Sequence, residues 1–375
     1  MKKLAIIIPA YKPRFLRETL DSIAKQNNHD FTVYIGDDAS PYQLETIVDQ
    51  YKNKFDIIYH RFEQNMGKKD LPGHWERCIL LSEEEFIWLF SDDDLMPFDG
   101  VARVIQALQK HSGGKYIFRF PLEVVDEYGK LKYKNPPFKT DLISGYEFLL
   151  DKLSGKISSA ACEYVFSRTV WEQTGGFIKF PLAWCTDDAT WAKFAEFTGG
   201  IISLPGNPVS WRNAEGENIS NSTHFNKEKI SATILFIEWI GINYHSHLNE
   251  KKFKKAIKCY IHKFLHHSLK NDFSVHDLLH LCNALRKLTP NVSSYLEKNN
   301  IKKMKILFII PYIPFPLNSG GNQAFFNMVD YLRHKMDVSI LLQVQYASEA
   351  YDISKLKEIW DNVTFFVFTK KDDKQ

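Results

Sequence analysis

Three aspartates in succession, Asp92, Asp93 and Asp94, follow the apolar run 86–90. Carboxylates this close repel one another. At about 4 Å and an effective dielectric constant of about 20, each like-charged pair costs roughly 4 kcal/mol. Solvation or a bound cation relieves that repulsion, and Mg²⁺ and Mn²⁺ prefer one or two carboxylates together with phosphate oxygens. A metal clamp here would indicate a phosphorylated substrate; an exposed acidic turn is the alternative, and the triplet alone does not decide between them.

The first hundred residues alternate between continuous apolar runs and segments with helical spacing. Strands are predicted over 4–10, 31–40, 55–62 and 86–94, and helices between them over 14–26, 43–51 and 75–81. Because these runs are apolar throughout rather than alternating, both faces of each strand should be covered, as in a parallel α/β sheet. In open sheets of this kind, ligands bind beyond the carboxyl ends of the strands.

Polar or loop-forming residues stand at three of these carboxyl ends. Pro9-Ala10-Tyr11 closes the first run, Asp37-Asp38 the second, and the acidic triplet the fourth. We therefore expect three clusters at one rim of the sheet. Further strands are predicted over 116–125 and 160–167, and a helix over 190–197.

Composition narrows the class of protein. The chain has 375 residues with 44% hydrophobic content, enough for large buried cores, and a net charge of +3 gives no basic footprint for nucleic acid. Five cysteines without CxxC spacing indicate thiols in a reducing compartment. The opening run is predicted as a strand rather than a signal peptide, and 230–242 is too short to span a bilayer. A cytoplasmic protein is expected, with association at the inner face of the membrane left open.

The chain is predicted to divide into three parts. Residues 1–222 form the α/β domain, and 223–302 form a helical extension rich in Lys and His. A fresh strand, a proline-rich loop, a Gly-Gly pair and a helix begin a second, partial α/β domain over 303–375. That length gives only a marginal core.

Residues 1 to about 220 resemble family 2 glycosyltransferases with the GT-A fold, which move a sugar from a nucleotide-sugar donor with inversion at the anomeric carbon. Six segments carry the resemblance in order: IIIPAYKP, YIGDDAS, QNMGKK with GHWERC, FSDDDLMP, TGGF with CTDDATW, and PVSWRNAEGENIS. The resemblance implies a Rossmann-like, mostly parallel central sheet with flanking helices, Mg²⁺ or Mn²⁺ as cofactor, and a nucleotide sugar, expected to be a UDP-sugar, as donor.

The resemblance also implies roles for single residues. The donor is expected to contact Pro9, Ala10, Tyr11, Asp38, Asn65, Gly67, Asp93 and Arg212, with Asp38 at the nucleobase, Asp93 near the ribose and Arg212 at the diphosphate. Asp92 and Asp94 are predicted as metal ligands. The register stays open, because aligning Pro97 with the proline of relatives places their first aspartate at Phe90.

Asp188 matches the position of the catalytic base in this family. An inverting transfer needs one base to deprotonate the acceptor hydroxyl, and a carboxylate serves if burial or a neighbouring charge, here Asp187, raises its pKa. The alternative for this segment is capping of the helix that follows. Trp191 nearby is predicted either as core or as a ring that touches the acceptor sugar.

The sequence therefore predicts a metal-dependent, inverting glycosyltransferase that acts on a glycan or lipid-linked acceptor in cell-surface polysaccharide synthesis. A non-catalytic sugar-nucleotide-binding protein on a degenerate scaffold is the alternative, because a histidine that often follows the late arginine is replaced by Asn213-Ala214-Glu215. A nucleotidyltransferase is a weaker one, since PAYKPRF contains no glycine. The segment from Met304 resembles the start of family 4 glycosyltransferases with the GT-B fold. No oligomeric state is predicted.

Overall fold

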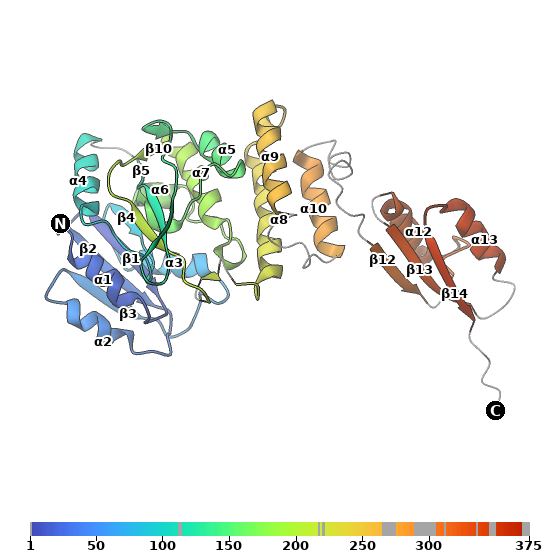
Figure 1. Cartoon of the computed structure of the whole chain (residues 1–375), viewed down its shortest axis with the longest axis horizontal. Coiled ribbons are helices and arrows are strands. Elements are labelled where there is room, and N and C mark those ends of the chain that lie inside the picture. Colours follow the sequence, from blue (N-terminus) through green and yellow to red (C-terminus); the bar gives the residue numbers. More distant parts are fainter. Residues whose placement is uncertain are drawn as a thin grey trace. The chain divides into compact units, whose positions relative to one another are not determined.

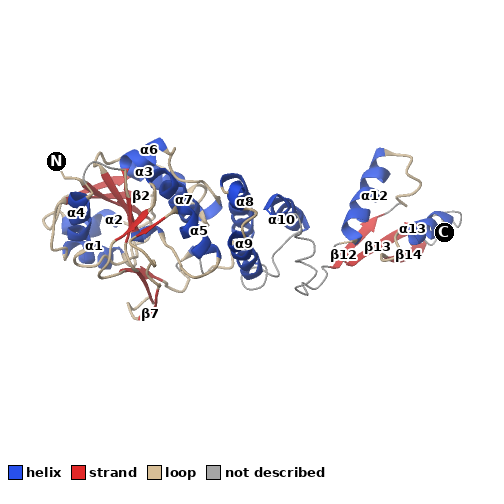
Figure 2. Cartoon of the chain, turned by 90° about the horizontal axis from the view of Figure 1, so that it is seen from above, coloured by secondary structure: helices blue, strands red, loops and turns tan. Residues whose placement is uncertain are grey.

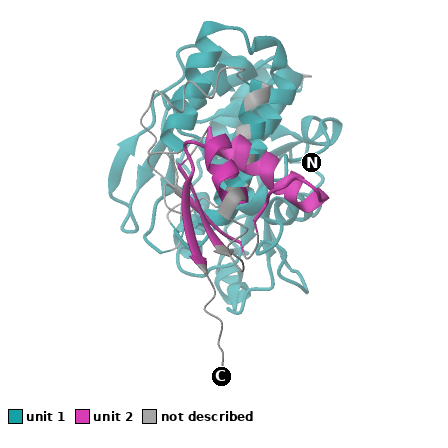
Figure 3. Ribbon diagram, turned by 90° about the vertical axis from the view of Figure 1, so that its right-hand side faces the viewer, with its two compact units in different colours: residues 1–289 teal, residues 290–375 magenta. Residues whose placement is uncertain are grey.

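The computed structural model describes residues 2–111, 115–216, 218–219, 222–264, 275–288, 305–310, 313–334, 337–344 and 350–369. The chain forms two compact units, residues 1–289 and 290–375 (Figure 3). The first unit contains the large sheet with its flanking helices, and the second has a small sheet of its own (Figure 1).

Half of the large sheet is parallel, as predicted. Its strands are ordered β3-β2-β1-β4 and comprise β1 (Leu4–Ala10), β2 (Phe31–Asp37), β3 (Ile57–Arg61) and β4 (Phe86–Leu89). The connections contain α1 (Leu16–Ala24), α2 (Leu44–Val48) with the short helix η1 (Asp49–Tyr51), and α3 (Leu71–Ile79). Helix α3 begins earlier than predicted because the Asp70 side chain accepts a hydrogen bond from the Gly73 amide at 2.9 Å and caps it.

Two strands of the other half run against the rest. The order continues β4-β9-β5-β10-β8, in which β9 is antiparallel to both β4 and β5, and β8 is antiparallel to β10. The new strands are β5 (Ile117–Arg119), β8 (Leu142–Ile143), β9 (Tyr164–Ser167) and β10 (Ile201–Ser203). The beginning of β9 therefore lies at the rim where the parallel strands end, and it brings the short helix η2 (Ala161–Glu163) to that rim.

A second, three-stranded sheet follows the order β11-β6-β7. Its strands are β6 (Leu122–Val125), β7 (Leu131–Lys134) and β11 (Val209–Arg212). Leu95 and Ser210 exchange backbone hydrogen bonds of 3.0 Å each, so the chain just after the acidic triplet is tied to β11. The remaining helices here are α4 (Gly100–Lys110), α5 (Gly145–Leu153), α6 (Arg168–Gln173), η3 (Pro181–Ala183) and α7 (Thr186–Thr198).

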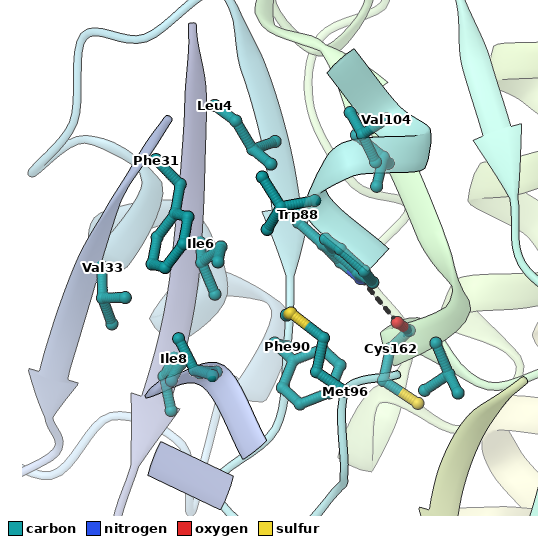
Figure 4. Packing of buried hydrophobic residues seen from close by; sticks show 14 of the residues in the cluster. Leu4, Ile6, Ile8, Phe31, Val33, Trp88, Phe90, Met96, Val104 and Cys162 are labelled. Carbon is teal, nitrogen blue, oxygen red and sulfur yellow. Dashed lines mark hydrogen bonds between the residues drawn. The ribbon is translucent and has the colours of Figure 1, made fainter. Parts of the chain in front are cut away.

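The core beneath the rim explains why the apolar runs form strands. Alternate residues of β1 and β2 point into it beside Trp88 and Phe90 (Figure 4). The Trp88 ring stacks on Phe120 with centroids 4.5 Å apart, and its Nε1 donates a 2.7 Å hydrogen bond to the Cys162 carbonyl. Fully burying a side chain of this class contributes about 1.5–3 kcal/mol. The base of the rim is therefore rigid, and η2 is anchored to it.

The region after residue 222 is helical where it is described, as predicted. It comprises α8 (Asn226–Asn243), the short helix η5 (His245–His247), α9 (Lys251–Lys263) and α10 (Val275–Leu288). Figure 2 shows α8, α9 and α10 in blue. These helices belong to the first compact unit, so the predicted boundary at residue 222 falls inside that unit. No helix within the described ranges is long and apolar enough to cross a membrane.

The second unit is a parallel β-α-β-α-β arrangement. Strands β12 (Lys305–Ile310), β13 (Asp337–Val344) and β14 (Thr364–Thr369) pair in that order, and α12 (Gly320–Arg333) and α13 (Ala350–Ile359) connect them. The side chains of Val329, Ile340 and Trp360 are fully buried in it. The α/β character expected here is confirmed, whereas the resemblance to family 4 enzymes stays a prediction.

Candidate active site

The ends of β1 and β2 are joined by backbone and hydroxyl contacts. The Asp38 amide donates to the Ala10 carbonyl at 2.9 Å, and the Ser40 hydroxyl donates to the Tyr11 carbonyl at 2.6 Å. Pro9 pairs with Gly36 inside the sheet. Of the three residues predicted at the end of the first strand, Tyr11 is the exposed one, with 40% of its surface accessible.

Asp38 organises the turn that contains Asn65 and Gly67. Its carboxylate is 3% exposed and accepts hydrogen bonds from the Met66 amide at 2.7 Å and the Gly67 amide at 2.8 Å. The Asn65 side chain donates to the Asp38 carbonyl at 3.0 Å. A Cβ at position 67 would lie 2.7 Å from Asp38 Oδ2, so only glycine allows this close approach. The structure thus brings together three of the predicted donor-side residues; a contact of Asp38 with a nucleobase stays a prediction.

Two residues of α3 complete this cluster and were not among the predicted site residues. The Arg77 guanidinium bonds to the Asp38 carboxylate and donates to the Gln64 carbonyl at 3.0 Å. His74 Nδ1 lies 3.6 Å from the same carboxylate, and burial lowers the His74 pKa to about 4. The segment GHWERC already pointed to this helix, but a charge pair with Asp38 could not be read from spacing alone.

The three aspartates of the triplet have different surroundings. Asp92 Oδ2 accepts hydrogen bonds from the backbone amides of Tyr11 at 2.9 Å and Lys12 at 3.1 Å. Asp94 is fully buried, and its Oδ1 accepts from the Arg212 amide at 2.8 Å while the Cys162 thiol lies beside the carboxylate. Burial raises the Asp94 pKa to about 6. Asp92 thus ties the triplet to the residues just after β1, and Asp94 ties it to the end of β11.

Asp93 is the member of the triplet best suited to hold a cation. Its side chain is half-buried, and the nearby charges of Lys12 and Arg212 only partly offset the influences that raise its pKa. Burial raises its pKa well above the usual range, and the charges of Asp94 and Asp92 raise it further. A divalent cation at Asp93, with Asp92 beside it, would relieve this repulsion. In the part of the chain that the structure describes, no group of three or more His, Cys, Asp or Glu side chains is arranged to hold a metal.

Arg212 is fully buried and supports the triplet from behind. Its Nε donates to the Asp93 carbonyl at 2.9 Å, Nη1 to the Glu127 carbonyl at 2.9 Å, and Nη2 to Glu18 Oε2 at 2.6 Å. The guanidinium also lies over the Phe15 ring, 4.4 Å from its centroid. These contacts occupy the fork that was expected at the diphosphate. In this structure Arg212 positions the acidic loop, and a direct phosphate contact stays a prediction.

The segment with Asp187 and Asp188 opens helix α7. Three non-glycine residues just before it, Leu182, Ala183 and Cys185, have left-handed backbone angles with φ of 59°, 55° and 63°. Each such residue costs about 1–2 kcal/mol relative to the right-handed region. This strained turn sets the direction in which the first turn of α7 begins.

Asp187 and Asp188 differ in their partners. Asp188 is 6% exposed, and Lys152 Nζ at the end of α5 lies 2.8 Å from its Oδ1. Burial raises the Asp188 pKa, whereas Lys152 and Arg119 oppose that rise. Asp187 is half-buried, and burial followed by the Asp188 charge raises its pKa to about 7. The carboxylate predicted as the base is therefore held in an ion pair, and its neighbour is the one poised to exchange a proton near neutral pH.

Buried charges link this segment to the triplet. Glu163, at the end of η2, is fully buried and accepts a 3.1 Å hydrogen bond from Arg119 Nε. The Glu163 charge raises the Asp187 pKa, while the neighbouring Cys162 thiol lies against Asp94. The start of β9 thus lies near both the acidic triplet and the Asp187-Asp188 segment. Trp191 is fully buried and stacks on Tyr164 with centroids 4.6 Å apart, so it is core and does not reach an acceptor.

Residues 5–164 match the family model described as Glycosyl transferase family 2. This part of the chain is therefore similar to family 2 glycosyltransferases. Among curated proteins, the chain is 32% identical over 97 residues to the poly(ribitol-phosphate) beta-N-acetylglucosaminyltransferase TarS of Staphylococcus aureus, covering 25% of this chain and 17% of TarS. It is 24% identical over 176 residues to the GalNAc(5)-diNAcBac-PP-undecaprenol beta-1,3-glucosyltransferase of Campylobacter jejuni, covering 46% of this chain and 54% of that enzyme.

Solved structures share the fold of this chain. The crystal structure of S. aureus TarS 1-349 in complex with UDP-GlcNAc superposes with a TM-score of 0.58 at 18% identity, over 78% of this chain and 83% of that one. The structure of the same protein with UDP gives a TM-score of 0.54. The expected GT-A-like fold, with a mostly parallel central sheet and flanking helices, is confirmed.

Proposed function

We propose that the protein is a metal-dependent, inverting glycosyltransferase that moves a sugar from a UDP-sugar to a glycan or lipid-linked acceptor in cell-surface polysaccharide synthesis. The observation that carries this proposal is the convergence of the acidic triplet and the Asp187-Asp188 segment on one rim, through Cys162 and Glu163. A nucleotide-sugar transferase needs a cation site and a base close together. The family match over residues 5–164 supports the reaction class.

The donor side is assigned to the rim between β1 and β4. Tyr11, exposed at the end of β1, would contact the nucleoside, and Asp92 fixes its backbone relative to the triplet. Asp93, with Asp92 beside it, would hold Mg²⁺ or Mn²⁺. When bound, the cation neutralises negative charge that develops on the departing diphosphate. Asp94 and Arg212 keep the triplet in place from within the protein.

The base is assigned to the Asp187-Asp188 pair, with divided roles. The acceptor hydroxyl oxygen forms the new bond to the anomeric carbon as the bond from that carbon to the diphosphate breaks, and the hydroxyl proton passes to a carboxylate. Asp187 suits this step because its raised pKa lies near the working pH. Asp188, paired with Lys152, would hold the first turn of α7 in place. This shifts the predicted base by one residue.

Release of UDP from nucleotide sugars, measured with Mn²⁺, with Mg²⁺ and with EDTA, tests the proposal. Turnover should require a divalent cation, and Asp187→Asn should lower it by about 10²–10⁴-fold. Asp49→Asn, an exposed ion-pair partner of Lys52 on the far helix η1, is the matched control and should be unaffected.

Two outcomes would contradict the proposal. Cation-independent turnover would remove the metal role. Binding of UDP-sugar, seen as thermal stabilisation, without any turnover would indicate a non-catalytic sugar-nucleotide-binding protein instead. Full activity of Asp187→Asn together with loss of activity in Asp188→Asn would return the base to Asp188.

A further inference from the structure

Helix α9 carries a concentration of positive charge that the rest of the chain does not share. Its sequence KKFKKAIKCYIHK contains six lysines and no acidic residue. The whole chain has a formal net charge of only +3, so the remainder is net negative. The charge of α9 is therefore a local feature and not a reflection of general basicity.

The lysines of α9 are arranged on one side of the helix. Lys251, Lys255, Lys258 and His262 follow one another at spacings of four, three and four residues and form a single row. Lys252 and Lys263 lie beside that row, and all six of these side chains are exposed. The opposite side consists of Phe253, Ala256, Ile257 and Ile261, which are buried. We call the six exposed residues the basic face of α9.

The buried side of the same helix reaches the base-side segment of the candidate active site. Tyr260 lies in hydrogen-bonding range of Cys185, with 3.5 Å between its hydroxyl and the thiol sulfur. Cys185 directly precedes the first turn of α7, which carries Asp187 and Asp188. Helix α9 also packs on α5, the helix that supplies Lys152. The basic face and this segment therefore lie on opposite sides of α9, the helix that packs on α5 (Figure 1).

We propose that the basic face of α9 docks on an anionic phospholipid surface. Lysines close to such a surface each contribute on the order of a factor of five in affinity, and the effect falls off within a Debye length. Because the apolar side of α9 is buried in the protein, the attachment is electrostatic, without insertion into the hydrocarbon. Docking in this orientation would hold the base-side segment one helix away from the lipid surface, which suits an acceptor that is itself carried by lipid; this last consequence rests on the proposed function.

The surface fits a lipid headgroup plane better than a nucleic acid. Proteins that bind single strands combine basic grooves with exposed aromatic rings on which bases stack. Apart from the basic face, the exposed residue of α9 is Cys259, so none of the exposed residues of this helix is aromatic. The charge of the basic face is therefore complementary to a plane of lipid phosphates, without the stacking rings that a single-stranded nucleic acid would need.

Sedimentation of the full chain with lipid vesicles tests the proposal without any need for activity. Vesicles that contain phosphatidylglycerol should carry the protein down at low salt, and pure phosphatidylcholine vesicles should not. A variant with Lys251, Lys255, Lys258 and Lys263 each changed to Gln should lose about several hundred-fold in affinity. The matched control changes four exposed lysines elsewhere, Lys25, Lys52, Lys54 and Lys110, to Gln and should bind as the wild type does.

A further variant separates charge from side-chain identity. Changing the same four residues of α9 to Arg should restore vesicle binding. Equal binding to neutral and anionic vesicles, equal loss in the α9 variant and the control, or binding to RNA but not to vesicles would each overturn the proposal. Loss of UDP release with vesicle binding intact would instead count only against the proposed function.

Discussion

Asp92 and Tyr11, 81 residues apart in sequence, are joined by a 2.9 Å hydrogen bond from the Tyr11 amide to the Asp92 carboxylate. The Lys12 amide donates to the same oxygen at 3.1 Å. The end of β1 and the acidic triplet after β4 therefore cannot shift independently. A ligand that contacts both the end of β1 and the triplet therefore binds to two segments whose relative position is already fixed.

Removing this link should weaken donor binding. Each charge-assisted hydrogen bond of this kind contributes about 1.5–3 kcal/mol, so Asp92→Ala should weaken UDP binding by about tenfold or more. Asp92→Asn should retain more of the affinity than Asp92→Ala, because its carboxamide oxygen can still accept both amide hydrogens. Calorimetric titration with UDP and Mn²⁺ measures both variants. Equal affinity of Asp92→Ala and wild type would show that the link does not organise the donor site.

The ion pair between Lys152 and Asp188 should be a large contributor to stability. Removing one partner of a pair this well buried leaves an uncompensated charge, and Lys152→Met should lower the free energy of unfolding by roughly 3–5 kcal/mol. The double variant Lys152→Met/Asp188→Leu should recover much of that loss, since no charge is then left behind. Urea unfolding of the first unit measures both. A single variant no less stable than the double variant would mean that the pair is not coupled.

The pH dependence should follow Asp187. A base must be ionised to accept a proton, so kcat/KM should rise as the pH increases through about 7, the raised pKa of Asp187. Asp187→Asn should remove this limb as well as lowering the rate. A limb near pH 4 in the wild type would assign the base to an unshifted carboxylate.

The same shift gives a stability prediction of opposite sign. Between about pH 4 and about pH 7 the folded state retains a proton on Asp187 that the unfolded chain has released, so stability should fall as pH rises through this window. Asp187→Asn should flatten that fall. Thermal unfolding at several pH values, with Asp49→Asn as control, shows whether it does.

Arg212 distinguishes support of the triplet from direct phosphate binding. Arg212→Met keeps bulk over Phe15 but removes the hydrogen bonds to Asp93, Glu127 and Glu18. It should destabilise the first unit by about 2–4 kcal/mol and weaken donor binding with it. Glu18→Gln, whose side chain is 55% exposed, should change stability by less than about 1 kcal/mol. Lost UDP affinity in Arg212→Met at unchanged stability would instead favour a direct contact with the diphosphate.

The first four strands could be predicted from the sequence because their apolar runs are local signals. Runs 4–10 and 86–90 are buried on both faces of a parallel sheet, and each polar cluster follows directly from the end of its strand. The same logic placed Tyr11, Asp38 and the triplet at one rim. What the sequence could not reveal is which way each carboxylate turns.

Residues brought in by long-range pairing were missed. Glu163 and Cys162 reach the rim because β9 runs antiparallel to its neighbours, and strand direction is not written in a four-residue apolar run. Lys152 comes from α5, which could have been found from its capping box at Ser144 and Glu147. The ion pair between Lys152 and Asp188 could not have been predicted, because it depends on how α5 and α7 pack.

The left-handed turn at Leu182, Ala183 and Cys185 bears on how this protein can evolve. Glycine at any of these positions would relax the backbone and favour folding, yet it would also loosen the aim of the turn that follows. Substitutions at these three positions are therefore subject to opposite demands, from overall stability on one side and from a fixed start of α7 on the other.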